Sequence, residues 1–343
     1  MRKIKVSSPT RVDLAGGTLD LWPLYNFLAD ENGGATTVNL AIDIWTTVEI
    51  EEHSDPTEST VELISEDLGI SRKFSNLQEC LRTPDARLRL LQVQLEFWHP
   101  KQGFRLRTKS ESPVGGGIGG SSSLTVSLLK AFDQLSVTGS EGSRFSSINQ
   151  LVHVAHNLEA EVLNTPTGTQ DYYPAASGGL NILNYSVAGI SQKVLPVQGQ
   201  EIEKHFLLVY TGKSHHSGIN NFEVMIKAVQ KDVKVCTALQ KIKKIAQETA
   251  QACERGEYGR LPALFNQEYE ARVHLADSFS SPEIEKLREV SLQAGAEAVK
   301  ICGAGGGGCV LVWVPPDRRQ EVVSACERNG FQVLRAKPVA PLS

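Results

Sequence analysis

The sequence predicts an α+β protein with two domains. Segments with strand patterns and segments with helix patterns alternate in both halves of the chain, and no solenoid repeat is visible. The chain has 343 residues, enough for two domains or one large one. Hydrophobic residues make up 41% and charged residues 22% of it. This is the composition of an ordinary globular protein with a core, and it excludes a disordered or fibrous chain.

The charge and the cysteines limit the functional class. Lysines and arginines number 35 and acids 39, so the net charge is −4 and gives no general attraction to nucleic acid or to an anionic membrane. The first residues turn polar at Ser7, and no stretch of 18 apolar residues exists, so neither a secretory signal nor a transmembrane helix is expected. The six cysteines never form a CxxC pair and suit structural thiols in a reducing cytoplasm. Whether the chain forms a homodimer stays open.

Apolar periodicity places the elements of the first half. Strand patterns cover residues 3–7, 46–50 and 104–108, residues 12–15 read as an extended stretch, and the polar residues 51–60 indicate a hairpin or loop. Apolar positions between 87 and 97 fit a buried helix.

The later elements follow two glycine-rich runs. Residues 112–123 precede a helical pattern at 124–132, and residues 302–309 precede a strand pattern at 310–314. A long helical stretch is predicted from about 220 to 255. Its buried face would carry the apolar positions 226, 229, 233, 236, 239, 242 and 245. Its solvated face would carry lysines 227, 231, 234, 241, 243 and 244.

The first glycine run does not match either common nucleotide motif. Gly115, Gly117 and Gly120 satisfy G-x-G-x-x-G, but a run so rich in glycine does so almost automatically. The polar segment 109–113 precedes it in place of a hydrophobic strand, and the acid expected about 20 residues later is missing. Residues 212–214 end like a Walker A loop, yet Leu207 stands where that loop requires glycine.

The run nevertheless has the chemistry of an anion site. Glycines let successive backbone amides approach one phosphate, and the N-terminus of the following helix adds free amides and a positive dipole. The candidate ATP-binding residues are Gly115, Gly116, Gly117, Gly119, Gly120, Ser121, Ser122 and Ser123. The alternative is an ordinary loop with a serine cap.

Three segments in order resemble the GHMP kinase superfamily, named for galactokinase, homoserine kinase, mevalonate kinase and phosphomevalonate kinase. Residues 8–20 (SPTRVDLAGGTLD) are similar to its N-terminal substrate motif, 113–123 (PVGGGIGGSSS) to its ATP loop, and 300–309 (KICGAGGGGC) to its C-terminal glycine motif. The resemblance covers essentially the whole chain.

Within this superfamily the chain most resembles the heptose kinase branch, which phosphorylates a sugar phosphate at its anomeric hydroxyl. Residues 168–179, 210–216 and 282–287 support this. The resemblance implies a ribosomal S5 domain 2-like half over residues 1–185 and a ferredoxin-like α/β sandwich over residues 186–343. ATP and a sugar or sugar phosphate, foremost a heptose 7-phosphate, would bind between the halves.

The chain departs from the pattern of that branch at three places. Gly120 stands where the ATP loop normally has serine, and Gly-Gly-Thr-Leu-Asp replaces Gly-Gly-Gly-Thr-Asp, which displaces Thr18. His215 and His216 stand where the branch often has arginine and serine. These differences concern the choice of sugar more than the kinase chemistry.

The resemblance implies roles for residues around the reaction. Ser121, with Ser122 as the alternative, and Glu159 would hold Mg²⁺ with ATP. Asp171 would orient and deprotonate the sugar hydroxyl, and Arg11 would keep Asp171 ionised and steady the transferred phosphoryl group. Structural alternatives are a solvated helix acid for Glu159, a turn or cap residue for Asp171 and a structural salt bridge for Arg11.

The predicted substrate contacts extend from both halves. Thr18, Asp20 and Asp171 would meet sugar hydroxyls, Gly178 and Gly179 would let the backbone approach the sugar, and Lys213, His215 and His216 would meet a substrate phosphate. Gly305 to Gly308 would pack against the ATP loop and the sugar cleft. Two other functions stay open: another GHMP activity, such as a galactokinase-type, fucokinase-type or mevalonate-type kinase, and a catalytically inactive sugar sensor on the same fold.

Overall fold

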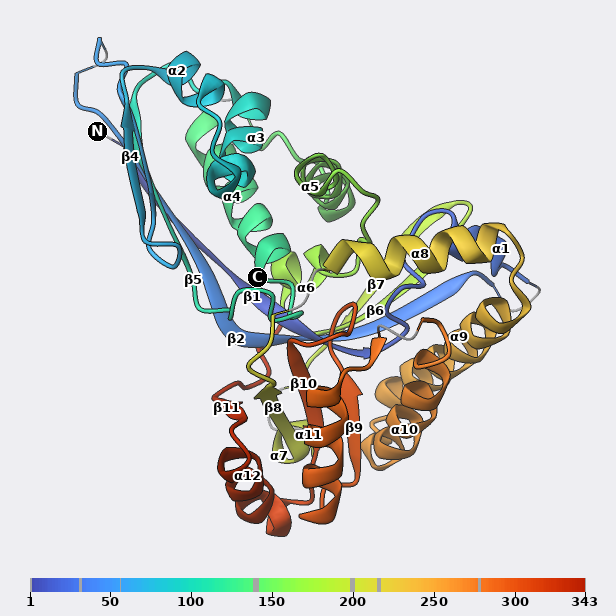
Figure 1. Cartoon of the computed structure of the whole chain (residues 1–343). Helices are drawn as coiled ribbons and strands as arrows, with labels where there is room; N and C mark the ends of the chain where they lie inside the picture. The colour runs from blue at the N-terminus through green and yellow to red at the C-terminus, as the bar shows by residue number, and fades with distance from the viewer. Residues whose placement is uncertain are drawn as a thin grey trace.

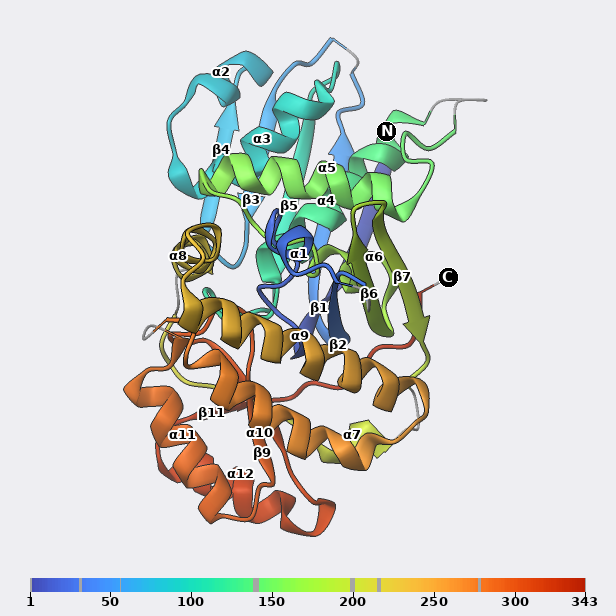
Figure 2. The same ribbon diagram turned by 90° about the vertical axis from the view of Figure 1, so that its right-hand side faces the viewer.

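Two β-sheets, each covered by helices, form the protein (Figures 1 and 2). The computed structural model describes residues 2–30, 33–55, 57–137, 142–197, 201–214, 217–276 and 279–342. The elements in chain order are β1 (Lys3–Ala15), α1 (Leu24–Phe27), β2 (Ala35–Glu52), β3 (Val61–Ser65), β4 (Ile70–Phe74), α2 (Leu77–Arg82), η1 (Ala86–Leu88), α3 (Arg89–Trp98), β5 (Phe104–Ser110), α4 (Gly120–Ser136), α5 (Ile148–Leu163), α6 (Tyr172–Ser177), β6 (Leu180–Ser186), β7 (Gly189–Leu195), α7 (Glu201–His205), β8 (Phe206–Tyr210), α8 (Ser217–Val229), α9 (Val233–Glu254), η2 (Tyr258–Arg260), α10 (Leu261–Arg272), α11 (Pro282–Gln293), β9 (Ala298–Ile301), β10 (Cys309–Trp313), η4 (Pro316–Arg318), α12 (Arg319–Arg328) and β11 (Gln332–Leu334). The predicted α+β class is confirmed.

The first sheet is built on two long antiparallel strands, β1 and β2. Its order is β4-β3-β5-β2-β6-β7, with β1 paired to β2, and only β3 and β5 run parallel. Burial alternates along β1 from Lys3 to Ser7 and is continuous from Ser8 to Ala15, because protein covers both faces there. The strand predicted at 3–7 and the extended stretch at 12–15 are therefore parts of one strand.

Helices α3, α4 and α5 cover one face of this sheet (Figure 1). The helix predicted at 87–97 is confirmed as η1 followed by α3, and the pattern at 124–132 lies inside α4. Because α4 begins at Gly120, the end of the glycine run forms its first turn.

The second sheet has the order β11-β8-β10-β9, with every pair antiparallel. Numbered within this half, the order is 4-1-3-2, and the elements follow the β-α-β-β-α-β pattern of a ferredoxin-like fold. Helices α11 and α12 lie side by side on it (Figure 1). The predicted ferredoxin-like second half is confirmed.

The predicted long helix from 220 to 255 is wrong as a single element. It is divided into α8 and α9 at residues 230–232, where Lys231 has a φ of 60° and the Asp232 side chain accepts a hydrogen bond from the Val235 amide at 2.9 Å. The break changes the helical phase, so the predicted apolar stripe does not lie on one face. Leu239, Ile242 and Ile245 are buried, but Val233 is 80% exposed.

Lys243 corrects the prediction that the lysines of this region form a solvated face. Its side chain is buried, its ammonium donates to the carbonyls of Leu28 and Gly33, and it forms an ion pair with Asp30 at 2.8 Å. The other five predicted lysines are at least partly exposed. Lys243 therefore ties α9 to the loop between α1 and β2.

The end of the chain returns to the first sheet. The amide of Val339 donates to the carbonyl of Ala41, and the amide of Leu342 donates to the carbonyl of Ser177. Since β7 also pairs with β6, we propose that the boundary predicted after residue 185 lies after Leu195, and that the final segment packs with the first half.

Two sequence expectations concern the cysteines and membrane spans. All six cysteines are free thiols, and five of them are buried, as expected for structural cysteines. Within the described ranges, no helix is both long and apolar enough to cross a membrane.

Candidate active site

A cavity lies where the two halves meet, and most of the predicted site residues line it. Those that do are Arg11, Thr18, Asp20, Gly115, Gly116, Gly117, Gly119, Gly120, Ser121, Ser122, Glu159 and Asp171. They come from β1 and the loop after it, the glycine run, α5 and the segment before α6. Residues 160 positions apart in the sequence thus meet in one site.

The first glycine run folds as an anion-binding loop. Every second residue is a glycine in the left-handed region, with φ values of 64° at Gly115, 70° at Gly117 and 71° at Gly119. Such alternation turns successive amides toward one point, which makes an anion-binding concavity. Gly119 is also the N-cap of α4 and offers no side-chain cap, so the amides of the first helical turn stay open to a ligand.

Of the three serines after this loop, Ser121 and Ser122 line the cavity and Ser123 does not. Ser121 is exposed, and Ser122 is buried and donates to Glu159 Oε2 at 2.8 Å. Ser123 is fully buried, and its hydroxyl donates to the carbonyl of Ser8 at 3.0 Å. Ser123 therefore binds α4 to β1 and does not line the cavity, contrary to its prediction as an ATP contact.

Glu159 is a buried carboxylate beside the glycine loop. It is 4% exposed, and burial raises its pKa, although hydrogen bonds from the neighbouring hydroxyls oppose the rise. No lysine, arginine or histidine in the part of the chain that the structure describes forms an ion pair with it. A buried carboxylate without a cation is costly, so this position suits a carboxylate that acquires a cation with its ligand.

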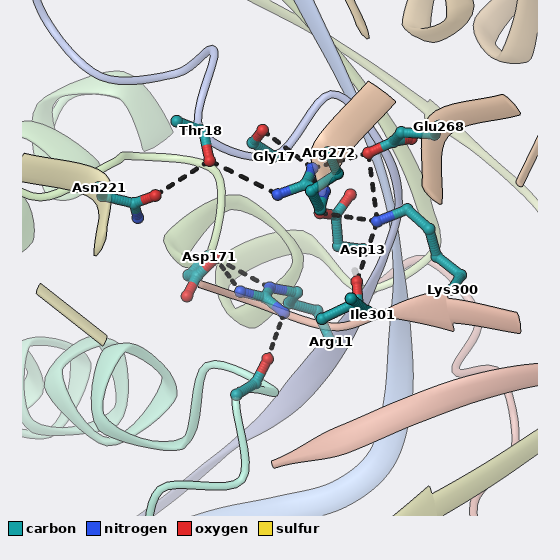
Figure 3. Close-up of polar contacts among 11 residues, drawn as sticks. Arg11, Asp13, Gly17, Thr18, Asp171, Asn221, Glu268, Arg272, Lys300 and Ile301 are labelled. Atoms are coloured by element: carbon teal, nitrogen blue, oxygen red, sulfur yellow. Dashed lines mark hydrogen bonds and ion pairs between the residues drawn. The ribbon is translucent and has the colours of Figure 1, made fainter. Parts of the chain in front are cut away.

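Arg11 joins the glycine loop to Asp171 (Figure 3). Its Nε and Nη2 donate to Asp171 Oδ1 at 2.8 and 2.6 Å, and its Nη1 donates to the carbonyl of Gly117 at 2.8 Å. Burial acts to lower the pKa of Arg11, but the negative charges of Asp171 and Asp13 outweigh it and raise that pKa. Arg11 is thus a permanent buried cation.

The two hydrogen bonds that Arg11 donates to Asp171 are both accepted by the same oxygen, Oδ1. Among the described residues, none donates to its second oxygen, Oδ2, and the Asp171 side chain keeps 23% of its surface exposed. Asp171 occupies the N-cap position of α6 but makes no capping hydrogen bond. Its carboxylate therefore faces the cavity with one oxygen available.

Asp20 also lines the cavity, and it is more deeply buried than Asp171. Its Oδ2 accepts a hydrogen bond from the Gln170 amide at 3.0 Å, and a Cβ at Gly168 would lie 1.9 Å from that oxygen. Burial raises the pKa of Asp20 to about 6, and the charge of Asp171 adds to the rise. Glycine at 168 is thus required for the close approach.

Behind the loop after β1 lies a cluster of four charged side chains, each at most 1% exposed: Asp13, Glu268, Arg272 and Lys300 (Figure 3). Arg272 Nη2 donates to Glu268 at 2.6 Å and to the carbonyl of Gly17 at 3.0 Å. Lys300 Nζ lies 3.3 Å from both Asp13 and Glu268. This buried charge cluster ties β1 to α10 and β9 with two charges of each sign.

The second glycine run packs against the first through Gly303 and Cys309, and not through the predicted Gly305 to Gly308. A Cβ at Gly303 would lie 2.9 Å from the carbonyl of Gly117, and the amide of Cys309 donates to the carbonyl of Gly116 at 2.7 Å. Gly303 and Ala304 line the cavity. The run also meets Phe279 and Lys213, since Gly306 and Gly308 donate to their carbonyls.

Gly178, Gly179 and Lys213 lie away from the cavity, contrary to their prediction as substrate contacts. A Cβ at Gly178 would lie 2.3 Å from the carbonyl of Ala340, and the amide of Gly179 donates to Val339. These glycines make room for the end of the chain. The ammonium of Lys213 pairs with Glu283 at 3.2 Å. The predicted contacts His215 and His216 lie outside the described residues.

Several residues of the site were missed. Asn221 and Gln170 line the cavity. Arg272 donates a hydrogen bond to the hydroxyl of Thr18, which also lines it. Gln170 stands next to Asp171, and Asp13 and Lys300 lie inside two of the motifs, so those positions were signalled. Nothing in the sequence around Asn221 or Arg272 marks them.

Two family models match this chain. Residues 86–179 match the GHMP kinases N terminal domain, and residues 249–332 match the GHMP kinases C terminal domain. The chain belongs to the GHMP kinase family. It has the two-domain fold of these enzymes, and it is an ATP-dependent kinase with an alcohol group as acceptor.

Relatives of this GHMP kinase include several enzymes of different names. A D-glycero-alpha-D-manno-heptose 7-phosphate kinase of Campylobacter jejuni is 25% identical, over 96% of this chain and 94% of its own. A mevalonate kinase of Methanocaldococcus jannaschii is 23% identical, over 89% and 93%. The structure of a D-glycero-D-manno-heptose 1-phosphate kinase from Bacteroides thetaiotaomicron superimposes with a TM-score of 0.72 at 23% identity, over 98% of this chain and 96% of that one.

The raised pKa of Asp20 predicts a pH-dependent stability difference in the ligand-free kinase. Above pH 6 the folded protein carries a buried charge that the unfolded chain holds in water. Well below pH 4 the carboxyl is neutral in both states. Asp20→Asn should therefore be more stable than wild type at pH 8, by on the order of 3 kcal/mol, with the difference fading as the pH falls below 4. Urea unfolding at several pH values measures it. A difference that does not change with pH would contradict burial of the charge.

Proposed function

We propose that this kinase transfers the γ-phosphoryl group of ATP to a hydroxyl, the anomeric one, of a sugar or sugar phosphate, and that its acceptor is a heptose 7-phosphate. The observation that carries the proposal is the Asp171 carboxylate. It has one free oxygen, it is held by a buried arginine, and that arginine also binds the carbonyl of Gly117 in the anion-binding loop. Arg11 would thus position both the carboxylate that binds the acceptor and the loop that binds the phosphate donor.

The glycine loop and its neighbours would hold ATP. The amides of residues 117–120 and of the first turn of α4 suit the phosphates, while the amide of Gly116 donates to the carbonyl of Pro113. Beyond the loop the cavity is lined by apolar side chains that suit a purine base: Leu90, Val114, Leu124 and Leu163.

Asp171 would orient the acceptor hydroxyl and take its proton on Oδ2. An aspartate is a weak base, so its main contribution is position, with proton transfer late in a loose transition state. Arg11 holds the carboxylate in place and supplies positive charge where the phosphoryl group moves. Asp20 would accept hydrogen bonds from other hydroxyls of the sugar.

The site also fits Mg²⁺, because Glu159 is a buried carboxylate without a cation beside the loop. Mg²⁺ is commonly bound through one or two carboxylates together with substrate phosphates. Glu159 with the hydroxyl of Ser122 or Ser121 would hold it, and the ion would neutralise charge on the phosphates. The hydroxyls of both serines hydrogen-bond to Glu159 and both line the cavity, so Ser121, the first choice from the sequence, and Ser122 both stay candidates.

The acceptor class rests on the chemistry of the cavity and on the relatives. Asp20 and Asp171 offer carboxylate oxygens to the several hydroxyls of a polyol, which favours a polyol acceptor over an apolar acid such as mevalonate. We choose heptose 7-phosphate as the acceptor because the Campylobacter relative is named as a kinase of that compound. A galactokinase of Pyrococcus furiosus, 20% identical, and a bifunctional fucokinase/GDP-fucose pyrophosphorylase of Arabidopsis thaliana, 26% identical over 30% of its length, make free hexoses the acceptors to compare.

A coupled assay of ADP release over heptose 7-phosphate, hexose phosphates, galactose, fucose and mevalonate tests the proposal. Turnover of heptose 7-phosphate well above the others is expected. Preference for a free hexose would make the protein a galactokinase-type or fucokinase-type enzyme. If no acceptor is phosphorylated, the alternative of a catalytically inactive sugar sensor would be favoured.

Glu159→Gln should raise the Mg²⁺ concentration needed for half-maximal activity and lower kcat, because a neutral amide is a poor ligand for a hard cation. The KM for the sugar should stay close to that of wild type. Glu161→Gln is the matched control, since Glu161 lies on the same helix, exposed and paired with Arg89. An unchanged Mg²⁺ dependence in Glu159→Gln would remove Glu159 from the metal site.

Asp171→Asn keeps the shape of the side chain and removes its charge and basicity. Because general base catalysis contributes about 10²–10⁴-fold, kcat should fall by roughly that factor while ATP affinity in a calorimetric titration changes little. The melting temperature should fall, because the buried Arg11 loses its counter-charge, so kcat is compared at a temperature at which the variant is shown to be folded. A kcat within about threefold of wild type at saturating substrates would reject the assignment.

A further inference from the structure

Asn221 of α8 lies at the cavity and has a fixed orientation. Its Oδ1 accepts a hydrogen bond from the Thr18 hydroxyl at 2.9 Å, and Arg272 Nη1 donates to the same hydroxyl oxygen at 3.5 Å (Figure 3). No role follows for Asn221 from the motifs, and the mechanism above does not use it.

The hydrogen bond from Thr18 shows which end of the Asn221 amide faces the cavity. A guanidinium can only donate, so the Thr18 oxygen accepts from Arg272, and the hydroxyl proton of Thr18 is directed to Oδ1 of Asn221. The oxygen of Asn221 is thereby used. Its NH₂ group has no partner among the described residues and points away from Thr18, on the side of Asp171 (Figure 3).

The hydrogen bonds from Arg272 to Thr18 and from Thr18 to Asn221 begin in the buried charge cluster. Arg272 is 1% exposed and is held by Glu268 and by the carbonyl of Gly17, so its position is fixed. Thr18 itself has a φ of 81°, an outlying conformation for a β-branched residue that persists only where its surroundings impose it. A glycine would adopt this φ without strain, but it would lack the hydroxyl.

We propose that Asn221 is an acceptor-binding residue, whose NH₂ group donates to a hydroxyl oxygen of the sugar, and that Thr18 and Arg272 are positioning residues that set its amide. The proposal rests on the sugar kinase function above. Asp20 and Asp171 can accept hydrogen bonds from sugar hydroxyls when ionised but cannot donate. Asn221 supplies the complementary donor, so that a hydroxyl can both give and receive a hydrogen bond.

The test is the KM for the acceptor, measured in the full-length enzyme with whichever sugar of the panel wild type phosphorylates fastest. Asn221→Leu keeps the size of the side chain and removes the donor. Because one net hydrogen bond corresponds to about a tenfold change, KM for the sugar should rise about tenfold. The KM for ATP should not change, and kcat should fall less than about threefold.

Variants of Thr18 test the orientation. Thr18→Gly removes the hydroxyl, so KM for the sugar should rise. Relief of the backbone offsets the loss of the acceptor for Arg272, so the stability should stay close to that of wild type. Thr18→Ser keeps the hydroxyl and should bind like wild type. The double variant Thr18→Gly/Asn221→Leu should bind no worse than Asn221→Leu. His99→Gly, at another non-glycine residue with positive φ that is exposed and remote from the cavity, is the control for backbone relief.

The outcomes separate the two proposals. No turnover of any sugar by wild type would overturn the proposed function. Turnover by wild type with an unchanged acceptor KM in Asn221→Leu would overturn only the assignment of Asn221. Effects of Thr18→Gly and Asn221→Leu that multiply in the double variant would overturn the role of Thr18 in setting the amide.

Discussion

The site depends on a single buried arginine. A guanidinium cannot lose its charge inside a protein, so Arg11 must be surrounded by acceptors wherever the fold buries it. It finds them on two segments that are otherwise separate, the anion loop at Gly117 and the start of α6 at Asp171. Because one rigid planar group satisfies both, the arginine sets the distance between the anion loop and the Asp171 carboxylate.

Close backbone contact is the second constraint. The two glycine runs touch at Gly117 and Gly303, where a Cβ would lie 2.9 Å from a carbonyl oxygen. The cavity can therefore include loops of both halves without side chains filling it. Behind it, the buried charge cluster holds β1 against α10 and β9. Such clusters add little net stability, and here the cluster fixes the loop that carries Thr18 and Asp20.

Sequence reasoning found the parts of the site that lie inside motifs. Arg11 and Asp171 were predicted because the segments around them resemble GHMP kinase motifs, and the anion loop because of its glycine content. Gly178 and Gly179 were misassigned, since their spacing reveals a need for close approach but not which distant segment approaches. The same limit hid Asn221 and the burial of Lys243, which depend on where α8 and α9 meet the first half. The break between those helices was missed because the apolar spacing continues across it.

The most direct test of the role of Arg11 is a double-mutant cycle on kcat with Arg11→Met and Asp171→Asn, at saturating ATP and sugar. If the arginine acts through the carboxylate it holds, the two changes remove one unit. The kcat of the double variant should then lie within about threefold of the slower single variant. Losses that multiply would show that Arg11 and Asp171 act independently and would contradict a single group setting both halves of the site.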